Sequence, residues 1–344
     1  LSSQYYGAKE LKTVRRVFDL VLQIVIAGGT VFAIITFLLP TQIMSIFTTE
    51  ADVIELGAQY LRVTALIYLP HGISLVLSNV LRSIGNAKLG LYVSIASFIV
   101  NIGANYIFIF GKFGAPALGV MGAAVGTLIA RAVELLFCAI YLLKYEKVLQ
   151  YQLRGLLRLP GKALLSEFRR LGMPAIVSDS LLALAASITS VILGHMGKEI
   201  VSAYAIVTVM DRMATVAIQG ATSAAGVVIG QTVGEGEFER AQKEGWTFLI
   251  LSVAIGIFGG ILVLVLGEWS IGLYEIAPST VELTVYMMQA SAIIVFFQAV
   301  QSALSKGILR GGGDTKFLMV ADIIFQWVAS IPLGALEGLV LHLP

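Results

Sequence analysis

Two asparagines lie four residues apart in a long apolar stretch of this chain, at Asn101 and Asn105. Residues i and i+4 share one face of an α-helix, so both amide groups point toward the same neighbour. Amide oxygens are suitable ligands for a hard cation. The two amides can instead hydrogen-bond within a helix bundle, which would make them structural. The sequence alone leaves both interpretations open.

Three aspartates also stand in apolar stretches, at Asp179, Asp211 and Asp322. A carboxylate inside a membrane is costly unless it is paired, so each is a candidate for cation coupling. Asp211 lies about ten residues, or roughly 15 Å, into its predicted helix. Its neighbour Arg212 cannot face it on the same helix, so we expect a partner from another helix, or a proton. The alternatives are a structural ion pair for Asp211, stabilisation by a helix N-terminus for Asp179, and a snorkelling position at the membrane interface for Asp322.

A third group of side chains can contact an organic ligand. Methionine and aromatic side chains adapt to apolar molecules of varied shape. His71 follows Pro70 in mid-helix, and a histidine titrates near neutral pH. We therefore expect substrate contacts from Met210, Met213, Met288, Phe297 and His71. Ordinary helix packing, and a hydrogen bond within the bundle for the histidine, are the alternatives.

The composition determines which elements position these residues. Hydrophobic residues make up 58% of the 344 positions and charged residues 13%, with a mean hydropathy of +0.90. A soluble domain carries about 25% charged residues, so most of this surface must face lipid. Nine apolar segments are long enough to span a bilayer as helices. They are 14–39, 57–80, 89–111, 118–143, 172–194, 201–229, 245–267, 283–308 and 317–341.

The charges exclude some function classes and orient the helices. A scattered net charge of +2 does not indicate nucleic acid, and the single Cys138 excludes an intrachain disulfide. If nine helices alternate, eighteen of the 23 Lys and Arg residues fall in connections on one side and two on the other. The positive-inside rule then predicts an integral plasma (inner) membrane protein. Its N-terminus is cytoplasmic and its C-terminus external.

An internal duplication organises the helices. LRSIGNAK at 81–88 matches LRGGGDTK at 309–316, an offset of 228, and QYYG at 4–7 matches QTVG at 231–234, an offset of 227. Six predicted helices separate equivalent points, so both copies enter the membrane in the same direction. Parallel repeats of this kind are typical of transporters.

Completing both copies requires two further helices before this chain and one after it. We therefore expect an all-α polytopic membrane protein of two six-helix bundles, nine helices of which belong to this chain. The first bundle is 1–143 (helices three to six), a cytoplasmic linker is 144–171, and the second bundle is 172–344 (helices seven to eleven). We expect the protein to act as a monomer.

The motifs together resemble one family. Gln4-x-x-Gly7, Leu81-Arg82-x-x-Gly85, the segments 93–111 and 118–127, and LRGGGDT at 309–315 are similar to the MATE family of multidrug and toxic compound extrusion transporters. The resemblance implies export of small amphipathic, often cationic, molecules by alternating access, driven by inward flow of Na⁺ or H⁺. No further cofactor is implied.

The resemblance also suggests roles for single residues. Asn101 and Asn105 match family positions that line a cation site, as does Thr127 on the next helix. Some members carry a carboxylate where Asn105 stands, and the family's principal aspartate is expected on a helix preceding this chain. Gln298 and Gln301, further candidate substrate contacts, lie near a position where some members carry an acid and this chain has Ala299.

Two other functions fit the sequence less well. A lipid-linked oligosaccharide flippase needs a strongly basic cleft, whereas few basic residues lie inside the predicted helices. An intramembrane enzyme needs paired acidic metal motifs or a catalytic dyad. The three histidines, His71, His195 and His342, are far apart in the sequence. Export of small organic cations across the lipid bilayer is therefore the leading hypothesis.

Overall fold

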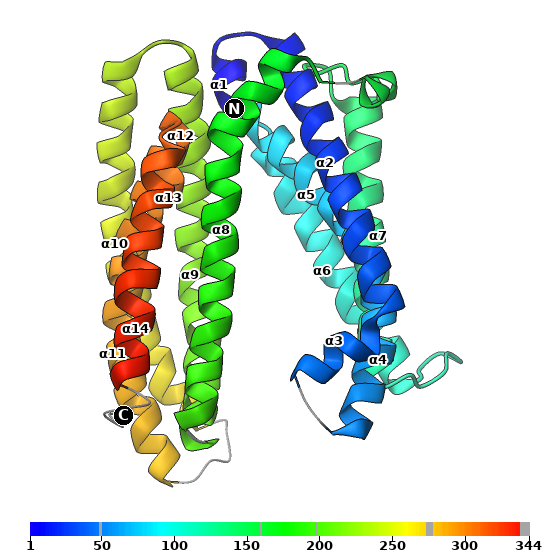
Figure 1. Cartoon of the computed structure of the whole chain (residues 1–344), viewed down its shortest axis with the longest axis vertical. Helices are drawn as coiled ribbons and strands as arrows, with labels where there is room; N and C mark the ends of the chain where they lie inside the picture. The colour runs from blue at the N-terminus through cyan, green and yellow to red at the C-terminus, as the bar shows by residue number, and fades with distance from the viewer. Residues whose placement is uncertain (48–49, 159, 197, 273–277, 338–344) are drawn as a thin grey trace. The chain divides into compact units, whose positions relative to one another are not determined.

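The computed structural model describes residues 1–47, 50–158, 160–196, 198–272 and 278–337. Figure 1 shows that these residues form long helices joined by short connections. The α-helices are α1 (Ser2–Gly7), α2 (Leu11–Leu38), α3 (Pro40–Phe47), α4 (Ala51–Ala65), α5 (Tyr68–Ser83), α6 (Ala87–Phe110), α7 (Val120–Ile140), α8 (Lys162–Met196), α9 (Lys198–Gly234), α10 (Phe238–Ile271), α11 (Pro278–Ser302), α12 (Arg310–Gly312), α13 (Thr315–Ile323) and α14 (Ile331–Ala335). Short π-helical segments at Tyr141–Tyr145, Ala303–Leu309 and Ile324–Ser330 extend three of them, and one 3₁₀ turn covers Leu153–Leu157.

Among the described residues, eight helices are long and apolar enough to cross a membrane. The pair α4 and α5, bent by 45° at their junction, gives a ninth candidate if the two helices together form one span. The all-α polytopic fold class predicted from the sequence is thus confirmed. The last predicted span, 317–341, is described as far as residue 337.

The bend between α4 and α5 has a local cause in Pro70. A proline lacks the N–H that would bond to the carbonyl four residues earlier, and its ring clashes with that carbonyl. That carbonyl belongs to Leu66, and the helix is interrupted at Leu66 and Ile67, between the two elements. The backbone N–H of His71 resumes the helical pattern by donating to the Ile67 carbonyl at 3.0 Å.

The chain divides into two compact units. One consists of Gln4–Gly161 with Ser2, and the other of Lys162–Pro344 with Leu1 and Ser3. The predicted linker residues 162–171 lie in the first turns of α8. Each unit has its own hydrophobic core.

In the N-terminal unit, one stripe of α2 packs against α5. Val14, Phe18 and Leu22, spaced four residues apart, are buried against Leu77 and Leu81. The rest of α2 is apolar too, and its later turns leave large side chains such as those at 31–35 exposed. A helix that is apolar all round, with only one stripe packed inside, is suited to lipid on its outer faces.

In the C-terminal unit, α9, α10 and α11 pack around a second core that includes Ile206, Met210, Met288 and Val295. Glycines allow a close approach further along α9. A Cβ atom on Gly307, in the π-helical segment after α11, would lie 3.0 Å from the Ala225 Cβ.

The duplicated motifs fold alike, bond for bond. After α5, Gly85 has φ +90° and the Asn86 N–H donates to the Leu81 carbonyl; 228 positions later, Gly313 has φ +96° and the Asp314 N–H donates to the Leu309 carbonyl. The side chains of Asn86 and Asp314 then accept a bond from the backbone three residues on and so cap α6 and α13. In both motifs the glycine therefore ends one helix and the Asn or Asp that follows it begins the next.

The connection after α7 folds back onto α2. The Tyr151 ring meets Phe18 edge-on at 4.7 Å, and its hydroxyl donates to Asp19 at 2.7 Å. The Gln23 amide donates to the carbonyls of Leu156 and Arg158, at 2.6 and 2.9 Å. Burial, followed by the bond to Asp19, raises the pKa of Tyr151 well above its usual range. This connection is thus part of the N-terminal unit's packing.

Candidate functional site

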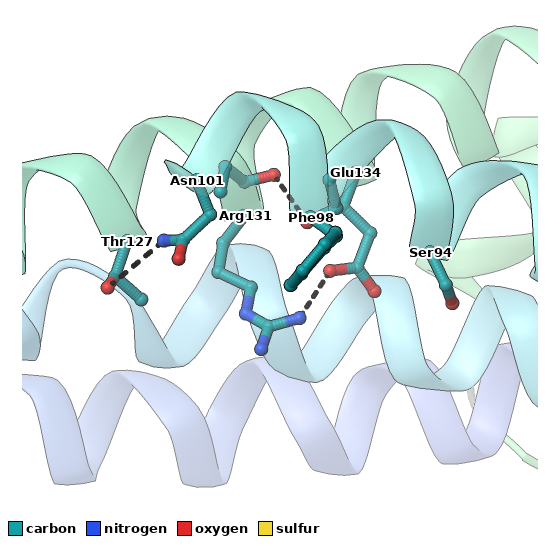
Figure 2. A pocket seen from close by; sticks show the side chains of 8 residues that line it. Ser94, Phe98, Asn101, Thr127, Arg131 and Glu134 are labelled. Atoms are coloured by element: carbon teal, nitrogen blue, oxygen red, sulfur yellow. Dashed lines mark hydrogen bonds and ion pairs between the residues drawn. The ribbon is translucent and has the colours of Figure 1, made fainter. Parts of the chain in front are cut away.

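A pocket of about 350 Å³ lies along helices α6 and α7 of the N-terminal unit. Figure 2 shows the side chains that line it. They are Ser94, Ser97, Phe98 and Asn101 from α6, and Thr127, Ala130, Arg131 and Glu134 from α7. Two of the residues predicted to bind a cation, Asn101 and Thr127, are among them.

Two glycines of α7 bring the helices close enough to form this wall. A Cβ atom on Gly122 would lie 2.4 Å from the Phe108 carbonyl oxygen. One on Gly126 would lie 2.2 Å from the Oδ1 atom of Asn105. Small residues four apart allow close helix contact in membranes. The same spacing therefore places the asparagines of α6 directly against α7.

Asn105, Asn101 and Thr127 form a continuous polar ladder. The Asn105 Nδ2 donates to the Asn101 Oδ1 at 3.2 Å, and the Asn101 Nδ2 approaches the Thr127 Oγ1 at 3.5 Å. The Thr127 hydroxyl donates to the Ala123 carbonyl at 2.9 Å. The Asn105 Oδ1 is buried and has no hydrogen-bond partner among the residues that the structure describes. The structure thus brings the three predicted residues together and leaves one acceptor unsatisfied.

Neutral oxygens of this kind suit a hard monovalent cation. The two amide oxygens and the threonine hydroxyl oxygen are the atoms that can coordinate such an ion here. The unsatisfied Asn105 Oδ1 is free to make that contact. Clusters of three or more His, Cys, Asp or Glu side chains that could hold a metal ion do not occur among the described residues.

An ion pair occupies the next turn of α7. The Arg131 Nη1 lies 2.6 Å from the Glu134 Oε2, and both side chains line the pocket. His71 of α5, which packs beside α7, interacts electrostatically with both charges. The His71 Nδ1 is buried, and no described residue forms a hydrogen bond with it. Sequence reasoning did not place this pair in a pocket, although two charges three residues apart in mid-span were a visible signal.

The three aspartates of the C-terminal unit each bond to a different helix. Asp211 of α9 accepts a hydrogen bond from Ser291 of α11. Asp322 of α13 accepts one from the buried Ser178 of α8. Asp179, next to Ser178, forms a two-bond ion pair with Arg310, at 3.0 and 3.1 Å. The aspartates therefore stand in three separate settings.

The candidate substrate contacts are also dispersed. Met210 and Met288 are buried in the core of the C-terminal unit, whereas Met213 and Phe297 are 56% and 63% exposed. Gln298 is exposed, and the Gln301 amide donates to Ser305 at 3.1 Å. Of the predicted contacts, His71 is the one beside the charged wall of the pocket.

Known proteins resemble this chain over most of its length. The MatE family model matches residues 1–107 and 174–336. The chain is 28% identical over 340 residues to the probable multidrug resistance protein NorM of Agrobacterium fabrum, covering 96% of this chain and 72% of that protein. It is 26% identical over 264 residues to the multidrug resistance protein MdtK of Yersinia pseudotuberculosis, covering 77% of this chain and 58% of MdtK.

Solved structures agree on the fold. One shows the outward-facing conformation of a multidrug resistance MATE family transporter of the MOP superfamily, with a TM-score of 0.87 and 18% identity. The match covers 97% of this chain and 74% of that one. A crystal structure of MATE in complex with MaL6 matches with a TM-score of 0.85 over 96% of this chain and 73% of that one, also at 18% identity.

Proposed function

This chain belongs to the MATE family of transporters, and on that premise we propose that it exports small amphipathic organic molecules, many of them cationic, in exchange for Na⁺ or H⁺. The observation that carries the proposal is the Asn105–Asn101–Thr127 ladder, which ends in an unsatisfied buried oxygen and borders a pocket. Transport, rather than catalysis, is the activity that follows from family membership.

In this proposal the ladder holds the coupling cation. The Asn101 Nδ2 now faces the Thr127 hydroxyl, so a cation enters by turning that amide until its oxygen faces Thr127 instead. Gly126 leaves room for the Asn105 oxygen beside α7. Neutral ligands bind a cation weakly enough to release it during each transport cycle.

Asp211 is the proposed second coupling group, in the C-terminal unit. It lies in α9 among core residues and accepts a hydrogen bond from the Ser291 hydroxyl of α11. A carboxylate without a cationic partner inside a bilayer favours uptake of a proton. Gain and loss of that proton would alter the link between α9 and α11.

We further propose that the protein lies in the plasma (inner) membrane with the N-terminus of this chain in the cytoplasm. The distribution of Lys and Arg supports this orientation. Single introduced cysteines provide the test. In intact cells, Lys198→Cys should react with a membrane-impermeant maleimide and Lys243→Cys should not; the reverse pattern would overturn the orientation.

Dye transport in everted membrane vesicles tests the function. We expect uptake of a cationic dye driven by a Na⁺ or pH gradient. Asn101→Ala should lower Na⁺-driven uptake at least about tenfold, and Asp211→Asn should do the same to H⁺-driven uptake. Asp52→Asn, at the exposed start of α4, is the matched control. If the wild-type protein moves the dye and both variants match it, neither group is a coupling site.

A further inference from the structure

The first part of the predicted linker, residues 144–158, exposes basic side chains that have no partner. Four basic residues and one acidic residue occur in it: Lys144, Lys147, Arg154, Arg158 and Glu146. All four basic residues are exposed, and none of their side chains forms an ion pair or a hydrogen bond with a described residue. The Glu146 carboxylate accepts the backbone N–H groups of Val148 and Leu149, at 2.8 and 2.5 Å. The segment's own acid is therefore bonded to the backbone and pairs with none of these charges.

Two contacts hold this segment at a defined height on α2. The Tyr151 hydroxyl donates to Asp19, and the Gln23 amide, one turn further along, donates to the Arg158 carbonyl. Asp19 and Gln23 are eight and twelve residues from the start of α2 at Leu11, or roughly 12 and 18 Å along the helix. Figure 1 shows the segment at the same end of its unit as the start of α2.

This height coincides with the membrane interface. Helix α2 has 28 residues, or about 42 Å of helix, whereas the hydrocarbon core of a bilayer is about 30 Å thick. Lys12, Arg15 and Arg16 place the excess of about 12 Å at the start of α2, where their charges stay among the lipid headgroups. The hydrocarbon therefore begins about eight residues into α2, at the level of Asp19. The segment lies along this border.

The 3₁₀ turn Leu153–Leu157 places an apolar side chain beside basic ones at this border. Residues three apart lie above one another in a 3₁₀ helix, so Arg154 and Leu157 share one side of the turn. Leu157 is 88% exposed, and Arg158 follows it directly. Acyl chains can bury the leucine, and arginine side chains are long enough to reach the phosphates above it.

We propose that this turn binds an anionic phospholipid: Arg154 and Arg158 hold the headgroup phosphate, and Leu157 enters the acyl chains. A guanidinium can form two parallel hydrogen bonds with a phosphate. An exposed leucine between the two arginines fits a phosphate that carries acyl chains better than free phosphate. Asp19, which interacts electrostatically with Arg158, is already bonded to the Tyr151 hydroxyl. The proposal is independent of the proposed transport function.

Lipid contact at the turn can be measured with a fluorophore. Leu157→Cys is labelled with bimane in the whole protein, since the thiol of Cys138 is fully buried and does not compete. The labelled protein is placed in phosphatidylcholine nanodiscs that contain a small, equal fraction of either phosphatidylglycerol or phosphatidylcholine with a nitroxide quencher on its acyl chain. We expect quenching by both, with the anionic lipid enriched at the label at least about fivefold over the neutral one.

Substitution of the two arginines tests their role. Arg154→Gln/Arg158→Gln should abolish the preference for the anionic lipid, whereas Arg154→Lys/Arg158→Lys should keep most of it because the charge remains. Both arginines are exposed, so both variants should fold, which an unchanged Tm verifies. A preference that survives in the folded glutamine variant would overturn the proposal.

Two controls separate this site from bulk lipid and from free phosphate. Bimane at Phe113→Cys, in the loop between α6 and α7, should show a smaller preference for the anionic lipid; an equal one would assign the effect to bulk lipid. Phe113 is 89% exposed and so matches Leu157. Excess inorganic phosphate should leave the preference at Leu157 unchanged, and its loss would assign the site to free phosphate. Either contrary result overturns the proposal, as does equal quenching by the two lipids or quenching by neither.

Discussion

The unsatisfied oxygen of Asn105 makes an unusual prediction about stability. Asn105→Leu keeps the size of the side chain, removes an unpaired buried acceptor and loses the bond to Asn101. An unsatisfied buried group costs about 1–3 kcal/mol. A side-chain hydrogen bond inside a membrane bundle contributes about 0.6 kcal/mol. The substitution should therefore leave the free energy of unfolding unchanged or raise it by up to about 2 kcal/mol.

Asn101→Leu is the matched control, one turn away on the same face of α6. It strands the Asn105 Nδ2, whose acceptor is the Asn101 Oδ1. Thr127 keeps its bond to the Ala123 carbonyl. The same chemical change should here cost about 1–3 kcal/mol. Asn101→Leu is thus expected to lower the free energy of unfolding, whereas Asn105→Leu should leave it unchanged or raise it.

Thermal unfolding in detergent, with NaCl exchanged for choline chloride, measures both effects. If the ladder binds Na⁺, a concentration ten times the Kd stabilises the wild-type protein by about 1.4 kcal/mol. Asn105→Leu should lose that response while being at least as stable in choline. A loss of more than about 1 kcal/mol in Asn105→Leu would refute the reasoning, because the oxygen would then have a partner that matters.

Three further outcomes are expected. Gly126→Ala should lower the free energy of unfolding by about 1–3 kcal/mol, because its Cβ meets the facing helix. Gly103→Ala, with open space around it, should not. Equal Tm values of the two variants in thermal unfolding would contradict the close packing. Asp179→Asn should cost no more than about 1 kcal/mol, since its pair with Arg310 is partly exposed, and a double-mutant cycle with Arg310→Ala measures the coupling. Tyr151 has a raised pKa in the folded state, so its contribution to the free energy of unfolding is complete below about pH 10 and falls above it. Tyr151→Phe should reduce that loss of stability at alkaline pH in a pH series of unfolding midpoints. An unchanged loss would exclude its hydroxyl as the cause.

Much of the fold was predictable because a bilayer imposes a length on its helices. Nine apolar segments of the required length were visible, and Pro70 indicated the kinked one. The shared face of Asn101 and Asn105 followed from helical spacing alone. Thr127 needed the family resemblance, since nothing local marks a threonine near a glycine as a partner of the helix before it.

The contacts of individual side chains could not be predicted, because they depend on which stripe of each helix meets another helix. An apolar sequence does not encode this clearly. Met210 and Met213 read alike in sequence, yet one is buried in the core and the other is exposed. Lipid and protein interior are both apolar, so hydrophobicity cannot separate the two environments. For the same reason the Arg131–Glu134 pair could be read as ordinary helix surface until the pocket beside it was seen.

The duplicated turns, one in each half of the chain, have kept the same backbone conformation. In the turn after Gly7, Lys9 has a φ of +61°, and its counterpart 227 positions later is Gly236, with a φ of +82°. In both turns the next residue, Glu10 or Glu237, donates its backbone N–H to the carbonyl five residues earlier. Side chains have diverged while the path of the backbone has not. A lysine in that conformation is strained where a glycine is not. The two turns therefore share one backbone conformation although their sequences differ.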